Sequence, residues 1–183
     1  KNDVRLLLLM DVGGTMDPYF EPVSRLLSAL HEERGLRDFK AYYFHNCVYE
    51  RVFETAQLMR KQSMTTTDLL RTYGERWKLV VVGDASMHPS ELTSARGNIN
   101  PRMETETSGL VWLDRLQRHF ERSAWLNPEM PEPWAMAGTV RTIASLFPMY
   151  PLTIDGIEQA VKSLVGARAE TAKAVLAAGS QAG

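Results

Sequence analysis

Residues 5–15, RLLLLMDVGGT, determine the fold that this sequence predicts. Leu6 to Met10 form an unbroken apolar run, which is typical of a strand that is buried on both faces of a parallel sheet. An aspartate, two glycines and a hydroxyl follow this run directly, and the glycines permit a tight turn that a ligand can approach closely. We therefore expect Asp11 and Thr15 at the carboxyl end of a central strand, where open α/β sheets place their binding crevice.

A second stretch, WKLVVVGDAS at residues 77–86, repeats this pattern. Its apolar run also leads into a glycine and an acid, Gly83 and Asp84. Two such strands joined through helical segments are expected to be parallel neighbours, because a parallel pair needs a long crossover connection. The pattern therefore predicts that Asp84 lies beside Asp11 at one edge of the sheet.

Apolar spacing and turn residues predict the remaining elements. We expect a helix carrying Val23, Leu26, Leu27 and Leu30 that ends at Gly35; strands at 40–44 and 47–53; a helix carrying Leu69, Leu70 and Tyr73, capped by Thr65–Thr67; a polar surface excursion at 87–108; a helix from Leu110 to Phe120; a strand at 124–126; a helix from Val140 to Phe147; a strand at 149–152; and a helix from Ile154 to Leu164. This order predicts one α/β domain over residues 1–165 with a doubly wound, mostly parallel, Rossmann-like sheet covered by helices on both faces. Residues 166–183 are rich in alanine and are expected to form a tail or linker.

Composition narrows the classes of partner. The 183 residues carry 21 Lys and Arg against 22 Asp and Glu, a net charge of -1, so we expect neither nucleic acid nor a membrane surface as a partner. No apolar run is long enough to span a bilayer and no signal peptide is recognisable. The single cysteine, Cys47, excludes an internal disulfide and favours a reducing, cytoplasmic compartment. Because the sequence begins at Lys1 rather than Met, we expect it to be a piece of a longer protein.

Three separated loops resemble the metal-ion-dependent adhesion site of von Willebrand factor A (VWA) domains. That family carries Asp-x-Ser-x-Ser after its first strand, a threonine in a second loop and an aspartate after a later strand. Asp11, Gly13 and Thr15 fall on the first element, Thr67 on the second and Asp84 on the third. Gly13 departs from the family pattern, because a glycine supplies no hydroxyl to a metal, and a weakened site is therefore expected.

The resemblance covers residues 3–165, including Pro18-Tyr19 and Trp125–Pro128, and is strongest to the intracellular bacterial branch described as CoxE-like. It implies a non-catalytic interaction module that binds Mg²⁺ or Mn²⁺ through Asp11, Thr15, Thr67 and Asp84, with the backbone of Gly13 and Gly14 in the metal loop. Mg²⁺ prefers six oxygen ligands and keeps several waters, which leaves a position for an Asp or Glu carboxylate of a partner protein. The CoxE-like branch further implies action with a MoxR-type AAA+ ATPase in protein complex remodelling or maturation.

Two enzymatic interpretations remain open. Haloacid-dehalogenase-like phosphatases carry Asp-x-Asp-x-Thr after the first strand, so that Asp11 would be the nucleophile, Thr15 a phosphate ligand and Asp84 a Mg²⁺ ligand. Gly13 then stands where that family has its general acid, without which turnover should collapse. Sugar kinases and actin-like ATPases share Asp-x-Gly-Gly-Thr, but their chain turns back into a second strand, where this sequence predicts a helix.

Purely structural roles and a zinc site also remain open for some of these residues. Asp11 and Asp84 would cap the helices that follow their strands, and Thr65–Thr67 would form an ordinary helix cap. His45, Cys47 and His88 would bind zinc, although their spacing fits no usual zinc pattern. Cys47 otherwise serves as a small apolar core residue.

Overall fold

The computed structural model describes residues 4–34, 37–100, 103, 105–134 and 136–165, and over 26–34 it describes only the backbone. The side chains of Leu26, Leu27 and Leu30, the helix end expected at Gly35 and the tail expected at 166–183 lie outside the described residues. Within the described part of the chain, no helix is both long and apolar enough to cross a bilayer.

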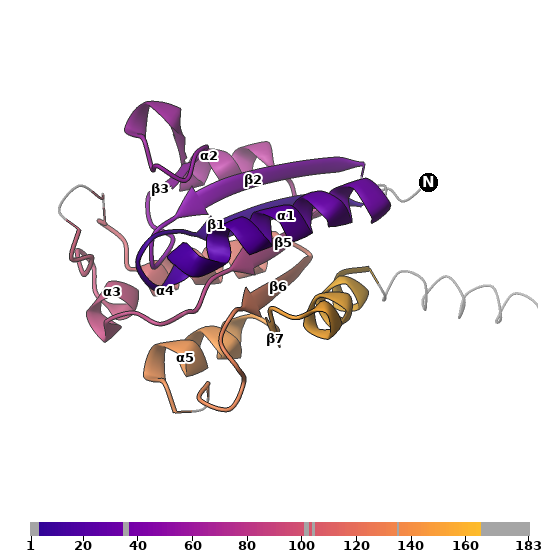
Figure 1. The fold of residues 1–183 in the computed structure, drawn as a ribbon. Helices are drawn as coiled ribbons and strands as arrows, with labels where there is room; N and C mark the ends of the chain where they lie inside the picture. The colour runs from indigo at the N-terminus through magenta and orange to yellow at the C-terminus, as the bar shows by residue number, and fades with distance from the viewer. Residues whose placement is uncertain (1–3, 35–36, 101–102, 104, 135, 166–183) are drawn as a thin grey trace, which may run out of the picture.

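The described strands form one mixed, mostly parallel sheet, shown in Figure 1, with the order β4-β3-β2-β1-β5-β6-β7. The strands are β1 (Arg5–Asp11), β2 (Asp38–Phe44), β3 (Arg51–Phe53), β4 (Ser63–Thr65), β5 (Trp77–Val82), β6 (Arg122–Asn127) and β7 (Met149–Pro151). β1 pairs in parallel with β2 on one side and with β5 on the other, while β3 and β4 are antiparallel at one edge. The prediction of a mostly parallel α/β sheet, with β1 central and β5 beside it, is confirmed.

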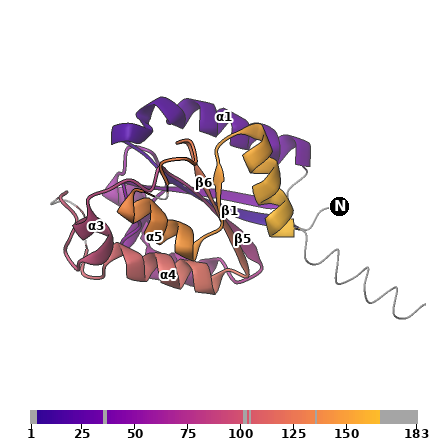
Figure 2. The same cartoon turned by 90° about the horizontal axis from the view of Figure 1, so that it is seen from below.

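Helices lie on both sides of this sheet. They are α1 (Asp17–Arg34), α2 (Thr66–Thr72), α3 (Pro89–Thr93), α4 (Gly109–His119) and α5 (Gly138–Leu146), and residues 154–165 are also helical. Figure 2 shows α1 and the 154–165 helix on one side of the strands, with α3, α4 and α5 on the other.

Two apolar clusters explain the unbroken run in β1. Successive strand residues point to opposite faces, so that Leu7 and Leu9 join the cluster that contains α4 and α5, while Leu8 and Met10 join the cluster that contains Val23 of α1. A strand covered on both faces has no solvent side, which is why none of these positions is polar.

The structure corrects two of the predicted elements and adds one strand. The expected strand at 47–53 is reduced to β3, and the polar residues after it form the short strand β4, which was not predicted. The expected surface excursion at 87–108 contains α3, whose Leu92 is buried in the core. Neither β4 nor α3 could be recognised from its own polar sequence. β4 forms because it pairs with β3, and α3 is placed by packing against α4.

Candidate functional site

The structure brings Asp11, Thr15 and Asp84 together where β1 and β5 end. Asp11 is the last residue of β1, and Asp84 follows β5 after one glycine. Thr15 lies in the short 3-10 turn η1 (Gly14–Met16), and its hydroxyl Oγ1 donates a hydrogen bond to Oδ2 of Asp84. One exposed hydroxyl therefore joins the loops that follow two neighbouring strands.

Asp11 is a buried acid in an acidic surrounding. It is 2% exposed, and its Oδ1 accepts a hydrogen bond from the backbone N–H of Asn46 at 2.9 Å. Burial raises the pKa of Asp11 well above its ordinary value, and the negative charges of Asp84 and Glu91 raise it further, against the lowering effect of the Asn46 hydrogen bond. Such a carboxyl group favours either a proton or a bound cation.

Asp84 is held in place by the loop after it and by β6. It is 3% exposed, and its Oδ1 accepts from the backbone N–H of Ser86 at 2.9 Å. Asn127 Nδ2 donates to the carbonyl of Asp84 at 2.9 Å, and Trp125 Nε1 donates to the carbonyl of Gly83 at 2.8 Å. The turn after β5 is thus fixed by side chains of the neighbouring strand.

The Gly13-Gly14 turn needs glycine for its backbone conformation. Gly13 has φ +85° and Gly14 has φ +59°, a region that side chains disfavour. A Cβ atom on Gly13 would also lie 3.3 Å from Nδ1 of His45, which donates to the carbonyl of Val12 at 2.7 Å. The His45 ring therefore borders the space that a serine side chain at position 13 would enter.

Glu91 is a third buried acid that the sequence did not single out. It is 2% exposed, its Oε1 accepts from Nδ2 of Asn46 at 3.1 Å, and its Oε2 accepts from the backbone N–H of His88 at 3.2 Å. Glu91 thereby connects α3 to Asn46, the residue whose backbone N–H donates a hydrogen bond to Asp11. The one sequence signal for it is a capping box, since a carboxylate at the third helical position reaches back to the cap residue.

Thr67, the fourth predicted metal ligand, lies in the first turn of α2 with an exposed side chain. α2 contacts β3 and β4, which lie beyond β2 from β1. Among the described contacts, no hydrogen bond links Thr67 to the group formed by Asp11, Thr15 and Asp84.

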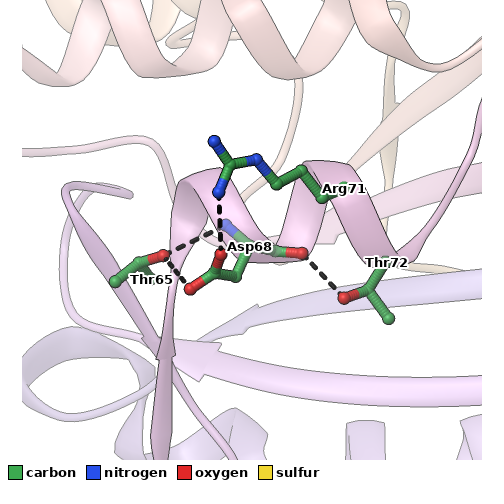
Figure 3. Close-up of polar contacts among 4 residues, drawn as sticks. All are labelled: Thr65, Asp68, Arg71 and Thr72. Carbon is green, nitrogen blue, oxygen red and sulfur yellow. Dashed lines mark hydrogen bonds and ion pairs between the residues drawn. The ribbon is translucent and has the colours of Figure 1, made fainter.

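The neighbours of Thr67 account for the threonine cluster as a helix cap. Thr65 Oγ1 accepts from the backbone N–H of Asp68 at 3.0 Å and donates to its Oδ2 at 2.7 Å, while Arg71 and Thr72 contact the same aspartate (Figure 3). Thr66 is buried and donates to the carbonyl of Tyr49. The first two threonines therefore have structural roles.

The contacts of Asp11 and Asp84 argue against a helix-capping role for either residue. Both accept hydrogen bonds within loops, from Asn46 and Ser86, so they do not cap the helices that follow their strands. The path of the chain also disagrees with a sugar kinase, because β1 continues into η1 and α1 and not into the second strand that this family has.

Metal binding by acidic, histidine and cysteine side chains alone is not supported. In the part of the chain that the structure describes, no three or more His, Cys, Asp or Glu side chains are grouped to hold an ion. Burial raises the pKa of the Cys47 thiol far above its usual range, so this cysteine is an apolar core residue rather than a thiolate. A cation at the edge of β1 and β5 would therefore depend on the Thr15 hydroxyl and on water as well as on carboxylates.

Comparison with models of protein families, with curated proteins and with solved structures finds no match to this chain.

Proposed function

We propose that this chain is a non-catalytic, VWA-type protein-interaction module that binds Mg²⁺ or Mn²⁺ through Asp11, Thr15 and Asp84. The observation that carries the proposal is the hydrogen bond from the Thr15 hydroxyl to Asp84, next to the buried carboxyl of Asp11. All three side chains offer hard oxygen atoms, the ligands that Mg²⁺ prefers.

The position of these residues in the sheet supports the proposal. α1 packs on one face through Val23, while α4 packs on the other through Leu113 and Leu116. The segment after β1 thus crosses one face of the sheet toward β2, and the segment after β5 crosses the other face toward β6. A doubly wound sheet is expected to have this arrangement. Open α/β sheets bind ligands at this point, outside the carboxyl ends of the strands where the strand order reverses.

The charges of the group also favour a cation. Asp11, Asp84 and Glu91 are each at most 3% exposed, and the two acidic neighbours raise the pKa of Asp11. A divalent ion would offset this repulsion, and its charge would dominate the local field. Gly13 supplies no side-chain oxygen, so the affinity is low, and the remaining positions of the octahedron hold water or a carboxylate of a partner protein.

The ATPase partner follows from the CoxE-like resemblance alone, and the single cysteine also favours a reducing compartment. We propose that the module acts in the cytoplasm with a MoxR-type AAA+ ATPase in remodelling or maturing another protein complex. An Asp or Glu side chain of the partner completes the coordination of the ion, and the segment around α3 supplies flanking contacts.

Calorimetric titration with MgCl₂ tests the cation site. Thr15→Val should weaken binding by at least about tenfold, a loss typical even of residues that only orient metal ligands. Thr67→Val is the matched control, because it makes the same change at an exposed position of α2. We expect it to leave binding unchanged; an equal loss would place Thr67 at the ion, and absence of binding to the unmodified chain would refute the proposal.

A further inference from the structure

Asn46 connects two of the buried acids near the end of β1. It lies in the turn that follows β2, and its backbone N–H donates to Oδ1 of Asp11 at 2.9 Å. Its side-chain Nδ2 donates to Oε1 of Glu91 on α3 at 3.1 Å. Asn46 therefore bonds one carboxylate through its main chain and the other through its side chain.

The turn at Asn46 has a backbone conformation that most side chains avoid. Asn46 has φ +58°, in the left-handed region, and the N–H of Cys47 donates to the carbonyl of His45 at 2.7 Å across it. Asparagine tolerates this region better than most residues, and such conformations persist only where the surrounding structure holds them. The hydrogen bond from its amide to Glu91 supplies part of that hold, so that the N–H of Asn46 stays directed at Asp11.

The hydrogen bond from Asn46 also determines which way the Asp11 carboxylate faces. Its Oδ1 lies on the side of Asn46, while its Oδ2 lies 3.4 Å from the position that a Cβ atom on Gly83 would take. Gly83 directly precedes Asp84, so Oδ2 faces the loop that follows β5. Holding Oδ1 therefore places Oδ2 on the side of Asp84, where the cation site is proposed.

Glu91 extends this arrangement to the surface of the chain. It is fixed within α3, because its Oε2 accepts from the backbone N–H of His88 at 3.2 Å. The same helix exposes Pro89 and Thr93 to solvent. α3 thus has a buried residue linked to Asp11 through Asn46 and exposed residues that a partner can reach.

We propose that Asn46 is a positioning residue that couples the cation site to α3. Its N–H orients Asp11 for the ion, and its side chain links that carboxylate to Glu91 and hence to the helix. The consequence for ion binding rests on the proposed function, whereas the hold of Asn46 on Asp11 needs no ion. Because coupling between sites is reciprocal, an ion whose binding is favoured by this link stabilises α3 by the same factor. Occupancy of the cation site therefore regulates the surface that a partner meets.

Asn46→Gly tests the positioning role by calorimetric titration with MgCl₂. Glycine adopts a positive φ freely and keeps the N–H, so the variant loses only the link to Glu91, and affinity should fall at least about tenfold. Tyr73→Phe is the matched control, because it removes another buried hydrogen bond, between the hydroxyls of Tyr42 and Tyr73 at 2.7 Å. Tyr73 packs on Trp77 at the opposite end of β5 from Asp84, so the control should bind Mg²⁺ normally. Unchanged affinity in Asn46→Gly, or an equal loss in both variants, would overturn the coupling.

Hydrogen exchange in EDTA tests the hold on Asp11 without an ion. In Asn46→Gly, the protection factor of the amide at position 46 should fall about tenfold relative to that of Val81 in β5, because the turn opens more easily without the side-chain hydrogen bond. Tyr73→Phe should leave this ratio unchanged. An unchanged ratio in Asn46→Gly would refute the positioning role even if Mg²⁺ binds. A lowered ratio in a chain that binds no Mg²⁺ would support the hold on Asp11 and refute the cation site together with the coupling.

The reciprocal effect is measured on the unmodified chain and so does not depend on the folding of a variant. The Ser94 amide donates to the carbonyl of Ser90 at the end of α3, and the Tyr73 amide donates to the carbonyl of Leu69 at the end of α2. Saturating Mg²⁺ should raise the protection of Ser94 at least about fivefold more than that of Tyr73. An equal response at the two helix ends would overturn the coupling to α3.

Discussion

Replacing Asp11 by asparagine should change stability in opposite directions without and with Mg²⁺. The pKa of Asp11 is raised by burial and by the charges of Asp84 and Glu91. The folded chain therefore holds the Asp11 proton to a higher pH than the unfolded chain, where the pKa is about 3.9. The free energy of unfolding consequently falls as pH rises from that value through the folded-state pKa, and this stability is missing above it.

Asparagine does not titrate, so Asp11→Asn removes this fall in the free energy of unfolding at higher pH while preserving the shape of the side chain. Its amide oxygen can still accept the N–H of Asn46, the hydrogen bond that Asp11 makes at 2.9 Å. At pH 7 in EDTA, Asp11→Asn should thus be more stable than the unmodified chain, and its stability should decline less between pH 4 and pH 8.

Mg²⁺ should reverse this order. At a hundredfold excess over its dissociation constant, an ion that binds only the folded state adds about 2.7 kcal/mol. For a chain of 183 residues, at about 2–4 °C for each kcal/mol, this raises Tm by about 5–11 °C. Asp11→Asn should show almost none of this increase, because a neutral amide does not replace the charge that binds the ion.

Thermal unfolding in EDTA and in MgCl₂, over a pH series, measures both effects. Asp155→Asn is the matched control, since Asp155 is exposed and lies in the 154–165 helix; it should retain the full Mg²⁺ response. The reasoning fails if Asp11→Asn is less stable than the unmodified chain in EDTA at pH 7, or if Mg²⁺ raises the Tm of both chains equally.

Three further outcomes are expected. Small phosphate esters should show no Mg²⁺-dependent turnover, because Gly13 offers no general acid; hydrolysis that disappears in Asp11→Asn would favour a phosphatase. Gly13→Ala should lower the free energy of unfolding, measured by chemical denaturation, by about 1–3 kcal/mol, because the positive φ and extended ψ of Gly13 disfavour a side chain. Gly138→Ala, which has open space around its Cβ position, should not lower it. A partner complex captured on the immobilised chain should dissociate in EDTA and weaken in Asp11→Ala; a complex insensitive to both, but lost when residues 90–100 are replaced, would reject the metal bridge.

The apolar run of β1 and its repeat in β5 determined, from the sequence alone, the central part of the fold. A strand covered on both faces admits only apolar residues, and its parallel neighbour must follow a crossover, so both signals are local in the sequence. The proximity of Asp11 and Asp84 followed from the same rule, because parallel neighbours end at one edge.

Contacts between distant segments decided what the sequence did not determine. Glu91 joins the group at Asp11 only because α3 packs where Asn46 turns, and His45 lies against Gly13 only because β2 pairs with β1. The hydrogen bonds that join Arg51, Ser63 and Arg60 likewise depend on the pairing of β3 with β4. Such pairings join short segments whose own residues prefer no particular partner, and only the packed sheet selects one arrangement for them.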